Sequence, residues 1–93
     1  MSATPQEEGR KLIAAYLKDR RIELNMSCED LGGLTNLSRS TIWRIEEGKF
    51  SPSLDTFLKI TQALNCYFFI ESKDSGSDNA KAFRERWGNR SEN

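Results

Sequence analysis

The most restrictive feature of this sequence is a series of residues that end and begin helices between positions 25 and 48. Asn25 tolerates the left-handed conformation that ends helices, and Ser27 follows it as a favourable N-cap. Asn36 and Ser38 repeat this arrangement, and Gly48 ends the segment that follows. The spacing therefore predicts two short helices joined by a turn of about three residues. They cover about residues 28–34 and 39–47.

Longer helices are predicted on both sides of this pair. An amphipathic pattern covers residues 7–24, and another covers residues 54–65 after Ser53 as N-cap. The apolar run at 66–70 favours a β-strand, and residues 79–88 favour a short last helix. The predicted fold class is all-α, with four to five helices and a short C-terminal β-strand.

Composition excludes several classes of function. The chain contains no His, which removes the commonest general base and most zinc sites, so we expect no enzyme, no metal and no cofactor. The two Cys residues are isolated and no apolar segment follows a basic start, which favours a cytoplasmic protein without a membrane span. Basic and acidic residues number 14 each, so any nucleic-acid binding must come from a local surface.

The segment 39–47 has two different faces. Ile42 and Ile45 are three residues apart and are predicted to point inward. Polar, cationic and aromatic side chains occupy the outward face: Arg39, Ser40, Trp43, Arg44 and Glu47. Two short helices joined by a tight turn, the second with such a face, have the geometry by which a helix enters the major groove of double-stranded DNA.

Four residues of this second helix are candidates for reading bases. Arg39 and Arg44 can each form a bidentate pair with guanine, Ser40 can donate to or accept from a base edge, and Thr41 offers a methyl group for thymine. Trp43 is left open between a contact with DNA and packing within the protein.

Phosphate contacts are expected beside the base-reading residues. The starts of the two short helices present free backbone N–H groups next to the hydroxyls of Ser27 and Ser38. Lys49, just after the second helix, can add a contact that orients the protein on the duplex.

Residues 20–64 resemble the Xre family of phage repressor and Cro-like DNA-binding domains, which have the lambda-repressor-like fold. Three segments carry the resemblance: RRIELNMSCEDL, NLSRSTIWRIEEGK and SPSLDTFLKITQAL. It implies base contacts by Arg39, Ser40 and Arg44, and phosphate contacts by Ser27, Cys28, Ser38 and Lys49. It also implies an ion pair between Arg21 and Glu46. The chain differs from the family's usual residues at three positions: Cys28, Gly32 and Asn36.

The predicted strand needs a partner, because an isolated strand leaves its backbone donors and acceptors unpaired. Its two faces are both apolar, with Cys66, Phe68 and Ile70 on one and Tyr67 and Phe69 on the other. A second copy of the chain can supply the missing strand across a two-fold axis. The tail after the fourth helix is similar to antitoxins of the HipB type, in which a terminal strand pairs across a dimer.

Two functional hypotheses remain open. The first is a homodimeric transcriptional regulator that binds an inverted repeat through the major groove. The second is an antitoxin or adaptor that holds a toxin-like partner protein and binds DNA for autoregulation. Both divide the chain into a helix-turn-helix domain at 1–64 and a dimerisation extension at 65–93. In the extension, Phe83 and Trp87 are expected to dock the last helix on the body or on the dimer partner.

Overall fold

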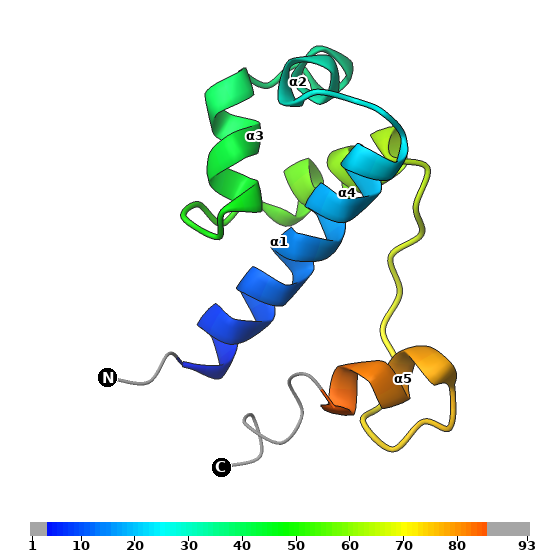
Figure 1. The fold of residues 1–93 in the computed structure, drawn as a ribbon. Helices are drawn as coiled ribbons and strands as arrows, with labels where there is room; N and C mark the ends of the chain where they lie inside the picture. The colour runs from blue at the N-terminus through cyan, green and yellow to red at the C-terminus, as the bar shows by residue number, and fades with distance from the viewer. Residues whose placement is uncertain (1–3, 86–93) are drawn as a thin grey trace.

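A computed structural model describes residues 4–85 of the chain, and this part contains five helices (Figure 1). The helices are α1 (Pro5–Glu23), α2 (Cys28–Thr35), α3 (Arg39–Glu46), α4 (Leu54–Ala63) and α5 (Asp78–Phe83). The first four bounds agree with the predicted helices to within two residues. No helix among the described residues is long and apolar enough to cross a membrane.

The core lies between α1, α2, α3 and α4. It is built from one apolar side of each helix, including both inward residues predicted for α3: Leu17, Leu31, Ile42, Ile45, Ile60 and Leu64. These six side chains are buried, so the four helices share one core. Figure 1 shows α2 and α3 together at one end of α1, with α4 beside them.

Local sequence explains where the helices begin and end. Ser27, Ser38 and Ser53 are the N-caps of α2, α3 and α4, and each hydroxyl accepts a hydrogen bond from the backbone N–H three residues later. Asn25 and Asn36 adopt the left-handed conformation predicted for them. Each Asn therefore turns the chain, and the serine two residues later starts the next helix.

The segment after α4 differs from its prediction. Residues 66–70 form no strand, and the described part of the chain contains none. Figure 1 shows this segment leaving the four-helix core and running to α5. The physical reason is that a strand is defined by its pairing, and no other described segment lies alongside it. Within one chain the predicted strand is therefore not formed, and a strand paired across a dimer stays a prediction.

The last helix is shorter than predicted in its described part. α5 begins at Asp78, with Ser77 as an N-cap that the sequence reading did not identify. Its Phe83 ring lies 5.8 Å, centroid to centroid, from the ring of Tyr16 on α1. The docking predicted for Phe83 on the body is thus present within one chain. Trp87 lies outside the described residues.

Candidate nucleic-acid interface

The turn between α2 and α3 is held in a close backbone contact. Three residues separate the helices, and the N–H of Leu37 donates to the carbonyl of Gly32 at 2.9 Å. A Cβ atom on Gly32 would lie 2.5 Å from the carbonyl oxygen of Leu37, too close for any side chain. Gly32 therefore has a steric role: it lets α2 approach the backbone of the turn closely.

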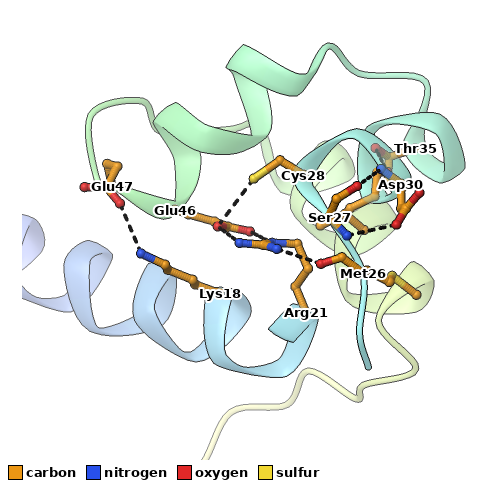
Figure 2. A network of polar contacts seen from close by, with 10 residues as sticks. Lys18, Arg21, Met26, Ser27, Cys28, Asp30, Thr35, Glu46 and Glu47 are labelled. Carbon is orange, nitrogen blue, oxygen red and sulfur yellow. Dashed lines mark hydrogen bonds and ion pairs between the residues drawn. The ribbon is translucent and has the colours of Figure 1, made fainter. Parts of the chain in front are cut away.

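A buried ion pair fixes α3 on α1 (Figure 2). Arg21 donates from Nε and Nη2 to the two carboxylate oxygens of Glu46, at 2.7 and 2.9 Å. Its Nη1 donates to the carbonyl of Met26 at 2.7 Å, just before α2. The hydrogen bond to Glu46 raises the pKa of Arg21, because it stabilises the charged guanidinium. The ion pair implied by the Xre resemblance is present and also holds the loop that leads into α2.

A second, more exposed pair joins the same two helices. Lys18 Nζ lies 3.5 Å from a carboxylate oxygen of Glu47, the residue that follows α3. Glu46 and Glu47 thus attach the end of α3 to α1 (Figure 2). The exposed residues at the start of α3 are Ser38, Arg39 and Ser40. This anchoring leaves the outward face of α3 free for a ligand.

That outward face carries the predicted base-reading residues. Arg39, Ser40 and Arg44 are exposed, and neither arginine forms an ion pair with another described residue. Thr41 is half-buried, and its hydroxyl lies 2.8 Å from that of Ser38. The geometry therefore presents Arg39, Ser40 and Arg44 to solvent and holds Thr41 at the start of the helix.

The start of α3 is suited to an anion. Its first turn contains no acidic residue, and the Ser38 hydroxyl lies 3.2 Å from that of Ser40 and 2.8 Å from that of Thr41. The first backbone N–H groups of a helix have no intrahelical partner and lie at the positive end of the helix dipole. This end of α3 therefore has the donors that a phosphate requires.

The start of α2 is chemically different. Ser27 and Asp30 form a reciprocal capping box: Ser27 N–H donates to the Asp30 carboxylate and Asp30 N–H donates to the Ser27 hydroxyl, both at 2.9 Å. Hydrogen bonding to the Asp30 carboxylate by the backbone and then the side chain of Ser27 lowers the pKa of Asp30. Glu29 adds a second acid in the same turn. Cys28 lies with its Sγ 3.9 Å from Glu46. The two residues expected to bind phosphate here, Ser27 and Cys28, thus have partners inside the protein.

A depression of about 550 Å³ lies between the two short helices. It brings together residues from the start of α2 and from the outward face of α3: Ser27, Cys28, Glu29, Arg39, Ser40 and Trp43. Five of these six were singled out from the sequence, and Glu29 was not. Ser38, Thr41, Arg44 and Lys49 lie outside its lining.

Lys49 is brought back over α3 by the turn that ends the helix. Gly48 adopts a left-handed conformation, and Lys49 N–H donates to the carbonyl of Arg44 at 2.9 Å. The Lys49 ammonium then lies 4.8 Å from the centroid of the Trp43 ring, within the range of a cation–π contact. Sequence reasoning treated Lys49 and Trp43 separately, although a helix-ending Gly between them was a signal that they could meet.

Comparison with known families now decides what this arrangement is. Residues 17–69, more than half of the chain, match the helix-turn-helix family HTH_3. The chain belongs to this helix-turn-helix family. The family consists of DNA-binding domains and is typically non-enzymatic, so the protein is a DNA-binding regulator in this general sense. The resemblance to Xre and lambda-repressor-like proteins is confirmed.

The comparisons with curated proteins and with solved structures found no match. The helix-turn-helix match ends at residue 69, so it covers only the first residues of the tail. The likeness to HipB-type antitoxins is therefore not confirmed.

The segment predicted as the dimer interface is largely exposed in this helix-turn-helix protein. Tyr67 is 97% exposed and Ile70 is 88% exposed, and Phe69 is also exposed. Phe68 makes an edge-to-face contact with Phe57 of α4 at 4.9 Å, and Cys66 packs against the core. The five residues thus divide into two that contact the body of the domain and three that contact mainly solvent.

Proposed function

We propose that the protein is a homodimeric, sequence-specific DNA-binding regulator in which each subunit places α3 in the major groove of one half of an inverted repeat. The observation that carries this proposal is the orientation of α3. Its inner side and its end are held by Ile42, Ile45 and Glu46, while Arg39 and Arg44 are exposed on the opposite side. A helix anchored in this way can enter the major groove without any change in the fold.

Arg39, Ser40, Thr41 and Arg44 carry the base contacts in this proposal. Each arginine offers two parallel donors to O6 and N7 of a guanine, a pair that discriminates by about 1–3 kcal/mol against other bases. Ser40 has a shorter side chain and contacts a base from the same side of the helix. Thr41 is less available for a base contact than the other three residues, because its hydroxyl is already hydrogen-bonded to Ser38.

Most of the proposed phosphate contacts come from the two ends of α3 rather than from the start of α2. Ser38 and the first N–H groups of α3 bind one phosphate, and Lys49 binds another beyond the end of the helix. Ser27 and Cys28 contribute less, because the capping box and two carboxylates occupy the start of α2. With a formal net charge of zero, the protein depends on these few positions for its electrostatic attraction to DNA.

Dimerisation is assigned to residues 66–70. Four of these side chains are exposed aromatic or aliphatic groups, and the segment has no backbone partner strand in the described chain. Pairing with the same segment of a second copy covers the apolar side chains and pairs the backbone groups. It also generates the two-fold symmetry that an inverted repeat demands.

Selection of bound sequences from a random duplex pool tests the proposal. We expect an enriched palindrome whose affinity falls steeply between 50 and 200 mM salt, on the order of a thousandfold for six phosphate contacts. Arg44→Ala is expected to lose about tenfold or more in affinity for this sequence. Lys81→Ala removes the same charge from α5 and serves as the control. A folded protein that enriches no sequence would refute the proposal.

A second candidate function, an adaptor or antitoxin that holds a partner protein, is favoured by one observation. An apolar groove of about 600 Å³ lies beside the first half of α1, and Phe50, Leu54 and Phe57 form part of its wall. Arg10 is the one charged residue of its lining, and the Arg10 Nε is buried with no hydrogen-bond partner among the described residues. The groove therefore suits a partner segment that combines apolar side chains with one carboxylate.

The two candidates make different predictions for the exposed Leu54. If a partner segment occupies the groove, Leu54→Glu is expected to abolish a stoichiometric complex with an identified partner and leave operator affinity unchanged. If the protein acts without a partner, native purification yields the helix-turn-helix protein alone, and Leu54→Glu has no complex to disrupt.

A further inference from the structure

Trp43 occupies a position on α3 that is unusual for a large aromatic side chain. It is 47% exposed and is not part of the core cluster. It lies four residues after Arg39 and three after Ser40, so all three share one side of the helix. Packing against α4, which the sequence left open, does not account for this ring.

The ring is nevertheless held in place. The Lys49 ammonium lies over it at 4.8 Å, and the turn at Gly48 fixes the backbone of Lys49. Trp43 also lines the depression together with Arg39 and Ser40. A flat apolar surface is therefore held among the polar groups expected to face the bases.

Base edges in the major groove present mostly hydrogen-bond donors and acceptors. The apolar exception among them is the C5-methyl group of thymine. If α3 enters the groove as proposed above, the Trp43 ring enters with Arg39 and Ser40, and burial of its exposed surface against a polar edge would leave donors or acceptors unpaired. A thymine methyl group can be buried against the ring without this cost.

We infer that Trp43 is a specificity-determining residue that recognises the C5-methyl group of one thymine in each half-site. This inference rests on the proposed function. Lys49 acts as a positioning residue for the ring and contacts the neighbouring phosphate. The competing candidate is Thr41, whose methyl group was predicted from the sequence to meet thymine but which is half-buried and tied to Ser38.

Replacement of thymine by deoxyuridine, one position at a time in the selected operator, removes the methyl group and keeps every hydrogen-bonding atom. The wild-type protein is expected to lose about fourfold in affinity at one position per half-site, the effect of one buried methyl group, and about sixteenfold when both half-sites are changed. In Trp43→Ala the same replacement is expected to change affinity by less than about 1.5-fold.

Three variants separate this role from the alternatives. Trp43→Phe keeps an aromatic ring and is expected to retain part of the thymine dependence. Thr41→Ser removes the competing methyl group and should retain all of it. Ile22→Ala shortens a comparably exposed apolar residue on α1 and serves as the control. Circular dichroism establishes that each variant is folded.

The possible outcomes distinguish a failure of the Trp43 inference from a failure of the proposed function. An operator whose affinity is insensitive to deoxyuridine at every position overturns the inference while the proposed function stands. Thymine dependence that persists in Trp43→Ala, or disappears in Thr41→Ser, assigns the contact to Thr41 and also overturns it. The absence of any selected operator overturns the inference together with the proposed function.

Discussion

Two neighbouring glycines in α2 have opposite surroundings. Gly33 is exposed and a Cβ atom added to it would meet nothing within 4 Å, whereas one on Gly32 would meet the Leu37 carbonyl. Gly33→Ala is therefore expected to raise the free energy of unfolding by about 0.5–1 kcal/mol, because Ala favours the helix and restricts the unfolded chain. Gly32→Ala is expected to lower it, because the turn must move. Urea unfolding of both variants measures the difference, and equal effects would contradict the steric role of Gly32.

The Asp30 carboxylate gives the start of α2 a dependence on pH. Its pKa is lowered in the folded state by the hydrogen bonds from Ser27, so its contribution to stability is present above the ordinary Asp pKa of about 3.9. This contribution is lost as the pH falls through the lowered folded-state pKa. We expect Asp30→Asn to lower the free energy of unfolding at pH 7 and to have little effect on it at the lowest pH, where the carboxylate is protonated.

Chemical denaturation at several pH values between 7 and 2.5 tests this prediction. Asp55→Asn changes an acid in the first turn of α4 and is the matched control. A pH-independent effect of Asp30→Asn would show that the capping box does not depend on the charge of the carboxylate.

Residue-level signals in the sequence predicted the helix ends well. Asn25 and Asn36 combine a side chain that tolerates the left-handed region with a serine two positions later, and this local chemistry needs no knowledge of the fold. The cation–π contact between Lys49 and Trp43 could not be predicted from such local chemistry, because it depends on the angle at which the chain leaves α3. Glu29 was missed because its place in the depression depends on the packing of α2 against α3.

At the scale of the elements, the orientation of α3 depends on the buried pair of Arg21 and Glu46, which are 9% and 8% exposed. Removal of one partner leaves an uncompensated charge, so Arg21→Met or Glu46→Leu alone is expected to cost about 3–5 kcal/mol of stability. The double variant is expected to cost clearly less than the sum, because two apolar side chains can pack where the ions were. Thermal unfolding of the four proteins forms a double-mutant cycle. Strict additivity would contradict a direct coupling.

Helices and the segment at 66–70 were not equally predictable. Each of α1 to α4 satisfies its own backbone hydrogen bonds, so its periodicity and caps are sufficient to locate it. A strand depends on a second segment. β-favouring residues such as Tyr67 and Phe69 favour an extended backbone but do not specify which segment pairs with it. The sequence therefore identified a segment that requires pairing, and the described chain supplies no partner strand for it.

The whole molecule joins the proposed DNA-binding side at α2 and α3 to an exposed apolar segment beyond α4. If residues 66–70 form the dimer, the variant that tests it must leave the domain intact. Phe68→Asp is a poor choice, because Phe68 contacts Phe57 and also lines the groove beside α1. Tyr67 is almost fully exposed, so Tyr67→Asp changes the interface and nothing in the core.

We expect Tyr67→Asp to sediment as a monomer with an unchanged unfolding midpoint at low protein concentration. Its affinity for an isolated half-site should equal that of the wild type, whereas its affinity for the complete inverted repeat should fall by a factor of at least ten, because the two half-sites are then bound independently. Leu34→Asp places the same charge on an exposed apolar position of α2 and controls for a general effect on association. A Tyr67→Asp protein that remains dimeric would move the interface to another surface, for which the groove lined by Phe50 and Leu54 is the next candidate.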